Sequence, residues 1–366
     1  MAEITASMVK ELREQTGAGM MDCKKALTKT NGNFEEAVEE LRKSGAAKAE
    51  KKASRIAAEG ITRVAVDGDK VAAVVEVNSE TDFVAKNEKF QNYVAQVAKQ
   101  AVKSNAKTMD EFMAEPWIED ASKTVNEVLV EMIAVIGEKL SIRRFEKVEA
   151  ANGCVVTYVH GGGRISVVVE ADCANVNDAV KEALTNIAMQ IAAMNPQYIS
   201  RNDISADEMA KLREITIDSA LNDPASLPKP ILQKLIDKAV NEKAWSDEDI
   251  ATYQEQKNNM NYLFNFLSKE AAATLARFAM EGKEAYVADK IFSGLVEGRI
   301  SKQIKEICLM EQVYVKAEDG KQSVEAYLKT VASDLKVKKF VRYETGEGLE
   351  KKNEDFAAEV AAQLNG

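Results

Sequence analysis

The sequence contains a single histidine, His160, among 366 residues. Zinc sites and Ser-His-Asp triads both rely on imidazole groups, so the chain lacks their usual ligands and bases. The four cysteines also lack the paired spacing of zinc and redox sites, because the closest two, Cys154 and Cys173, stand 19 residues apart. We therefore expect no metal, no cofactor and no catalytic triad, and a reducing compartment for the thiols.

Long apolar runs and an excess of positive charge are also missing. Residues 1–10 contain no apolar run of signal-peptide length, and no stretch approaches 18 uncharged apolar residues. The sequence therefore predicts a cytoplasmic protein with no membrane partner. The formal net charge of −10 argues against attraction to a polyanion, so we expect protein partners and no nucleic acid.

Proline and glycine are scarce, at 5 and 18 residues, and this scarcity favours regular structure. The chain is 46% hydrophobic and 30% charged, which suits packed cores, and its length predicts two or three domains. Abundant Ala, Glu, Lys, Leu and Met favour helix, while strands are confined to Val- and Ile-rich stretches. We predict an α+β, mostly helical fold.

Residues 5–44 predict a compact three-helix unit. Apolar residues recur at helical spacing in three short segments, and Asn33 with Glu36 forms a capping-box-like start for the third. Gly45 is expected to end that helix, followed by an Ala- and Lys-rich connector at 46–59. A unit this small buries little apolar area, so we expect it to dock on a partner.

The middle of the chain predicts strands with covering helices. We expect a hairpin at 61–66 and 71–77, helices at 87–102 and 125–136, strands at 140–148, 155–159 and 165–169, and a helix at 176–193. Later come a strand at 337–343 and a terminal helix containing Phe356, Val360 and Leu364. The strand, helix, strand pattern occurs twice, which suggests two related subdomains with antiparallel sheets.

Residues 206–311 predict long helices interrupted by Pro224, Pro228 and Pro230. The apolar residues of the middle part, 221–278, are too many to leave in water. We expect them to pack on each other within the chain, with dimerisation through this helical region as the alternative.

Two conspicuous motifs have ordinary interpretations. Residues 160–163, His-Gly-Gly-Gly, are similar to an esterase oxyanion hole, but the chain has no Gly-x-Ser-x-Gly elbow and no second histidine. We interpret this motif as a hairpin turn. A basic cluster is interpreted as a solvated face of the connector; it comprises Lys48, Lys51, Lys52 and Arg55.

Two other places allow either a structural or a binding role. The first place is the end of the hairpin. In the structural interpretation, Thr81 or Asp82 caps the next helix and Phe83 staples that helix to the core. In the binding interpretation, Asp82 and Phe83 form an exposed acidic and aromatic tip that contacts a partner. Met20 and Met21 are expected in the loop before a helix, in a unit too small to bury both easily, which allows an adaptable protein-contact surface. The residues alone leave both choices open.

Several separated motifs resemble the bacterial elongation factor Ts family. They are residues 3–6, 9–13 and 16–27, the loop Thr81-Asp82-Phe83-Val84-Ala85-Lys86-Asn87, and residues 136–138, 142–144, 158, 160–161, 164–165, 296–299, 340–348 and 355–360. The resemblance covers about 1–205 and 280–366. It departs from the family at Ser79, where a cysteine is expected, and at about 221–278, an insertion where the family has a short helical hairpin.

The resemblance implies a guanine-nucleotide exchange factor that is not an enzyme. The implied partner is elongation factor Tu, in its GDP-bound and nucleotide-free forms, whose Mg²⁺ site is disturbed so that GDP leaves and GTP can bind. Two sets of residues are expected to touch that partner: the loop residues Thr81, Asp82, Phe83 and Val84, and the N-terminal residues Arg13, Met20 and Met21.

The implied domains are a ubiquitin-associated-like three-helix domain (1–45), a linker (46–59), a core N-subdomain (60–148), a core C-subdomain (149–205 and 312–350), a helical hairpin region (206–311) and a C-terminal helix (351–366). Two other classes compete. An enzyme is opposed by the missing histidines and nucleotide loops. A helical interaction scaffold would bind a partner without accelerating nucleotide release.

Overall fold

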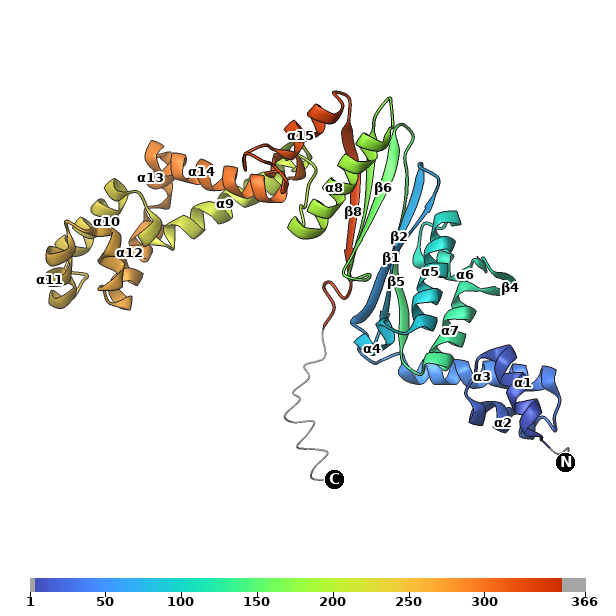
Figure 1. The fold of residues 1–366 in the computed structure, drawn as a ribbon. Helices are drawn as coiled ribbons and strands as arrows, with labels where there is room; N and C mark the ends of the chain where they lie inside the picture. Colours follow the sequence, from blue (N-terminus) through green and yellow to red (C-terminus); the bar gives the residue numbers. More distant parts are fainter. Residues whose placement is uncertain (1–3, 351–366) are drawn as a thin grey trace, which may run out of the picture. The chain divides into compact units, whose positions relative to one another are not determined.

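The computed structural model describes residues 4–350 of the chain (Figure 1). The contacts among these residues define two compact units: 4–195 with 326–350, and 196–325. We call these the first and the second unit. The expected terminal helix with Phe356, Val360 and Leu364 lies outside the described residues.

The first unit opens with the three expected helices, α1 (Ala6–Thr16), α2 (Met20–Lys29) and α3 (Phe34–Lys52). The side chains of Thr5 and Asn33 cap α1 and α3 by accepting from the amides of Met8 and Glu36. A small core closes the three helices; its buried members are Val9, Leu12, Cys23, Ala26, Leu27 and Ala37.

The expected end of the third helix at Gly45 is wrong, because α3 continues to Lys52. Gly45 is buried, and a Cβ added there would already lie 3.5 Å from the Ala134 side chain on α7 (Val125–Ile136). Gly45 therefore lies inside the helix, facing α7, and does not act as a stop signal. Arg42 on α3 also pairs with Glu131 on α7, at 3.8 Å.

The first sheet has three antiparallel strands in the order β1 (Glu59–Asp67), β2 (Val71–Ser79), β5 (Leu140–Glu149). Helices α5 (Glu88–Lys103) and α7 pack on it (Figure 1). Between them lie α6 (Met109–Ala114) and a short hairpin of β3 (Pro116–Trp117) and β4 (Asp120–Thr124), which were not predicted. Helix α7 ends as expected at Gly137, whose φ is 86°.

The second sheet is also antiparallel, in the order β6 (Cys154–His160), β7 (Ile165–Asp172), β8 (Lys336–Glu344), and α8 (Asp178–Met194) covers it. The turn between β6 and β7 holds three glycines with positive φ, so the hairpin interpretation of residues 160–163 is confirmed. The mixed, mostly helical fold with small antiparallel sheets is confirmed as well.

Strand β2 lies between these layers and is buried along nearly its whole length. Ala73, Val75 and Val77 belong to the core formed with α5 and α7. Ala72 and Val74 point to the opposite face and pack with residues of the second sheet. This alternation is the period of a strand that is covered on both sides.

The second unit is helical, with α9 (Ala206–Leu221), α10 (Lys229–Asn241), α11 (Asp247–Gln256), α12 (Lys269–Glu281), α13 (Lys283–Ala288) and α14 (Lys290–Ile307). 3₁₀ helices lie at Arg201–Asp203, Pro224–Ser226, Met260–Asn265 and Leu309–Glu311. Helix α15 (Val324–Val331) begins at the end of this unit and continues into the first unit, where it leads to β8. Leu235, Ile236, Leu263, Leu275 and Phe292 are among its fully buried side chains. The expected packing of residues 221–278 within the chain is therefore confirmed.

Within residues 4–350, no helix is both long and apolar enough to cross a membrane. The same residues contain no group of three or more His, Cys, Asp or Glu side chains placed to hold a metal ion. All four cysteines are buried free thiols.

Asp249 joins two helices of the second unit. Its carboxylate accepts from the Ser246 hydroxyl at 2.7 Å, and from the amide and hydroxyl of Ser268 at 2.9 Å each. Burial of Asp249 opposes its charge, but the hydrogen bonds from Ser246 and Ser268 outweigh burial and hold its pKa below the ordinary value. Its contribution to stability is therefore present above the unfolded-state pKa, and is lost as pH falls through the lower folded-state pKa.

We predict that Asp249→Asn destabilises the second unit at pH 7 by roughly 1–3 kcal/mol, and that the deficit shrinks as pH falls below about 4. Trp245 is buried in this unit, so its fluorescence in a Trp117→Phe background reports the transition during heating. Asp247→Asn, at an exposed position of the same helix, is the control. A deficit that stays constant from pH 7 to pH 3 would contradict the role given to this carboxylate.

Candidate partner-binding site

The loop after β2 turns sharply into the short helix α4 (Asp82–Ala85). Thr81 caps this helix: its hydroxyl accepts from the Val84 amide at 3.4 Å and donates to Glu138 Oε1 at 2.8 Å. Val84 is buried and packs in the core under the first sheet. Thr81 and Val84 therefore anchor the loop from inside, which bears out the capping half of the structural interpretation.

Two carboxylates hold the base of the loop reciprocally. Glu138 Oε2 accepts from the amides of Glu80 and Thr81, at 3.1 and 3.0 Å. Glu80 Oε1 in return accepts from the amide of Lys139, at 2.6 Å. We call this arrangement the carboxylate clamp. Hydrogen bonds to ionised acceptors are the stronger ones, so the clamp fixes the backbone on both sides of the loop.

The tip of the loop points into solvent. Phe83 is 79% exposed, so the interpretation of Phe83 as a staple to the core is wrong. Asp82 is also exposed and pairs with Lys86 at 2.7 Å; this hydrogen bond lowers the pKa of Asp82. The ammonium of Lys86 lies 6.0 Å from the centroid of the Phe83 ring. The tip thus offers an ionised carboxylate beside a bare phenyl ring.

The chain that follows α3 supports the clamp. Arg55 Nη1 lies 3.2 Å from Glu80 Oε1, and Lys139 Nζ donates to the carbonyl of Arg55 at 2.7 Å. Lys52 Nζ donates to the carbonyl of Gly137 at 2.5 Å. Lys52 and Arg55, which we interpreted as part of a solvated face, therefore also join the N-terminal helices to the loop base.

A second surface lies on the N-terminal helices. Met20 and Met21, at the start of α2, are 54% and 64% exposed. A shallow groove of about 340 Å³ begins at Met21 and continues over a basic stretch, lined by Met21, Lys24, Lys25, Thr28 and Lys29. Arg13 is exposed on α1. Burial raises the pKa of the Cys23 thiol, and the positive charge of Arg13 counters this rise in part.

Both surfaces are exposed to solvent. The tip carries a carboxylate, an ammonium group and a phenyl ring, and the N-terminal surface carries thioethers and lysines. Neither brings together a nucleophile, a base and an orienting group, which an active site requires. Fold and site together define a protein that presents a rigid acidic and aromatic tip beside a three-helix unit.

Comparison with known proteins agrees with this architecture. The family model described as Elongation factor TS matches residues 80–347. The chain is 42% identical over 367 residues to Elongation factor Ts of Clostridioides difficile (strain 630), covering all of both chains. It is 40% identical over 368 residues to that of Clostridium kluyveri (strain ATCC 8527), covering 99% of each. The chain belongs to the elongation factor Ts family and is a translation elongation factor.

These relatives correct one expectation. They align with the chain from end to end, so the expected limits of the resemblance, 1–205 and 280–366, are too narrow. Residues 221–278 are not an insertion relative to these proteins. These relatives therefore have a segment that aligns with the second unit.

The clamp predicts a local effect of Glu138→Ala. This change removes the acceptor of the Glu80 and Thr81 amides and of the Thr81 hydroxyl, while the core residues stay in place. Hydrogen–deuterium exchange of these amides should become about tenfold faster or more, with little change for α5. Glu127→Ala, which removes a carboxylate cap at the other end of α7, is the control. Unchanged protection at Glu80 and Thr81 would show that the clamp is not needed to order the loop.

Proposed function

We propose that the chain is a guanine-nucleotide exchange factor for elongation factor Tu. It binds the GDP-bound form, disturbs the Mg²⁺ site with the tip of the clamped loop, and speeds the release of GDP so that GTP can bind. The observation that carries this proposal is the exposure of Phe83 beside Asp82 on a rigid base, in a member of this family.

The mechanism needs no bond chemistry from this chain. Bound Mg²⁺ offsets the negative charge of the nucleotide phosphates, so its displacement weakens the hold on GDP. An inserted phenyl ring takes up space, and the carboxylate of Asp82 adds a negative charge near the phosphates. By linkage, GDP weakens the binding of this protein by the same factor as this protein weakens the binding of GDP.

The N-terminal surface has a different part in the proposal. Met20, Met21 and Arg13 hold the GTPase domain of the partner, and the tip acts on the nucleotide site. Exposed methionines adapt to an apolar partner surface at low cost in conformational strain. The competing function is a scaffold that binds without exchange, and acceleration of GDP release separates the two.

We predict that Asp82→Ala with Phe83→Ala lowers the acceleration of GDP release about tenfold or more and leaves the fold intact, because both side chains are exposed. The measurement is the release of fluorescent GDP from elongation factor Tu of the same organism. Phe266→Ala removes another exposed phenylalanine, 59% exposed in the second unit, and serves as the control. Wild-type rates for a well-folded double variant would refute the role of the tip.

A second prediction separates binding from exchange. Met20→Ala with Met21→Ala should raise the concentration that gives half-maximal exchange by about tenfold, and should change the maximal rate little. The two surfaces act at different steps in this proposal. Met194→Ala, at a methionine that is 49% exposed, is the matched control. An unchanged half-maximal concentration would remove the N-terminal methionines from the binding surface.

A further inference from the structure

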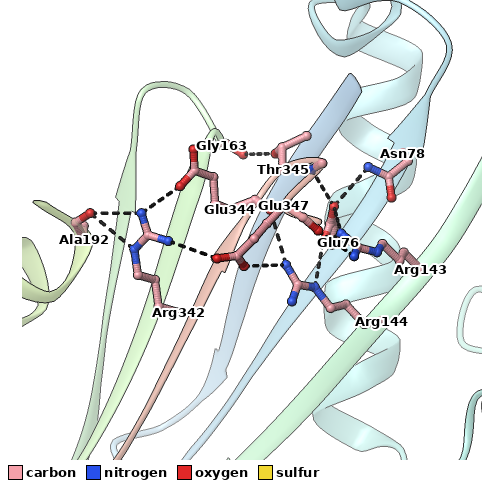
Figure 2. Close-up of polar contacts among 11 residues, drawn as sticks. Glu76, Asn78, Arg143, Arg144, Gly163, Ala192, Arg342, Glu344, Thr345 and Glu347 are labelled. Atoms are coloured by element: carbon pink, nitrogen blue, oxygen red, sulfur yellow. Dashed lines mark hydrogen bonds and ion pairs between the residues drawn. The ribbon is translucent and has the colours of Figure 1, made fainter. Parts of the chain in front are cut away.

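Glu76 is a fully buried carboxylate on β2, between the two sheets. Its Oε1 accepts from the amide of Gly346 at 2.8 Å and from the side chain of Asn78 at 3.0 Å. Its oxygens also accept from Arg143 Nη1 at 3.1 Å each, and Oε2 accepts from Arg144 Nε at 2.6 Å. Figure 2 shows these donors converging on the carboxylate from β2, from β5 and from the turn after β8.

This arrangement is expensive for stability alone. Glu76 continues the face of β2 on which Ala72 and Val74 pack with the second sheet, so an apolar side chain would extend that core. Burial of a carboxylate costs several kcal/mol, and replacing a buried ion pair with apolar residues is often neutral or stabilising. Conformational specificity is the better-attested use of such a group.

The specificity concerns the register of β5. Glu76 pairs with Arg144, but the next residue, Val77, pairs with Ile142. Arg143 is therefore the extra residue of a β-bulge, and two consecutive arginines reach one carboxylate. In a regular strand, neighbouring side chains would point to opposite faces of the sheet.

The bulge decides which residues reach the loop. On its far side Ser79 pairs with Leu140, which brings Glu138 and Lys139 opposite Glu80 and Thr81. A strand without the bulge would slip by one residue and turn each of these side chains to the other face. The carboxylate clamp would then lose its partners.

We propose that Glu76 is a positioning residue for nucleotide exchange: it holds the bulge at Arg143 and thereby sets the register that forms the clamp under the Asp82–Phe83 tip. The expected effect on the exchange rate rests on the proposed exchange function. The expected effect on the structure of the loop rests on the strand register alone.

The turn after β8 completes the site around Glu76. Arg143 Nη2 donates to the carbonyl of Glu347 at 2.6 Å, and Arg144 Nη2 lies 3.3 Å from the carboxylate of Glu347. The guanidinium of Arg144 also stacks on the ring of Tyr343, at 4.0 Å. Both arginines are thus held in place by β8 and its turn as well as by Glu76.

The test is Glu76→Gln, which keeps the size of the side chain and removes the charge shared by the two arginines. In the folded variant, the amides of Glu80, Thr81 and Lys139 should exchange with deuterium about tenfold faster. The maximal acceleration of GDP release should fall roughly tenfold, and the half-maximal concentration should change less than about twofold, because the methionine surface is untouched. Glu311→Gln, at a carboxylate paired with Arg201 in the second unit, is the control and should change none of these quantities.

A double-mutant cycle separates positioning from a general loss of stability. Added to Asp82→Ala with Phe83→Ala, Glu76→Gln should cost little further exchange, because the tip that it positions is already gone. Full additivity in the cycle, or native protection of the three amides in folded Glu76→Gln, would overturn the inference.

If Glu76→Gln does not fold, Arg143→Lys takes its place, since lysine keeps the charge but cannot bind both the carboxylate and the Glu347 carbonyl in the same way. The same amides should lose protection, and native protection would again overturn the inference. If the wild-type chain fails to accelerate GDP release, the proposed function falls, and amide exchange still decides whether Glu76 sets the register.

Discussion

Strand β2 is buried on both faces, and the first unit depends on how each face is covered. One face carries Ala73, Val75 and Val77 into the core with α5 and α7. The other begins with Ala72 and Val74 against the second sheet and continues with Glu76 and Asn78. Where the apolar residues of this face end, the negative charge of Glu76 must be neutralised inside the protein. Arg143 and Arg144 neutralise it, and the amide of Gly346 in the turn after β8 donates a further hydrogen bond. The polar end of this face is also the end from which the loop departs.

Rigidity of that loop has a direct energetic meaning for an exchange factor. Loosening GDP a hundredfold requires roughly 2.7 kcal/mol of coupling between the two ligands of the partner. Ordering one flexible residue on binding costs about 1–2 kcal/mol. For a mobile tip of a few residues, the free energy of ordering would therefore be as large as the coupling free energy. The carboxylate clamp and the buried Val84 order the loop in the free protein. In the proposed function, binding free energy then remains for the displacement of Mg²⁺.

Much of the fold could be predicted from the sequence, because the strands and helices of the first unit follow apolar periodicity and glycine turns. The position of Gly45 inside a continuing helix could not be predicted, because the residue that it faces, Ala134, lies far away in the chain. The clamp escaped prediction for the same reason: Glu138 acts on Thr81 across 57 residues, and no local spacing signals that pairing. Two adjacent arginines at 143 and 144 gave no sign of a bulge. The exposure of Phe83 was left open, since a staple and a contact residue have the same sequence pattern.

The late position of β8 in the chain sets an order for synthesis. This strand pairs with β7, and its turn supplies Gly346 to Glu76, yet the whole second unit, 196–325, is made before it. At about 5–20 residues per second, on the order of ten seconds pass between the synthesis of β7 and that of β8. During this time the edge of β7 and the two arginines lack their contacts with β8 and its turn. A nascent chain of this protein therefore carries an open sheet edge while residues 196–325 are already synthesised. A ribosome that stalls before residue 336 releases a product whose first unit lacks its closing strand.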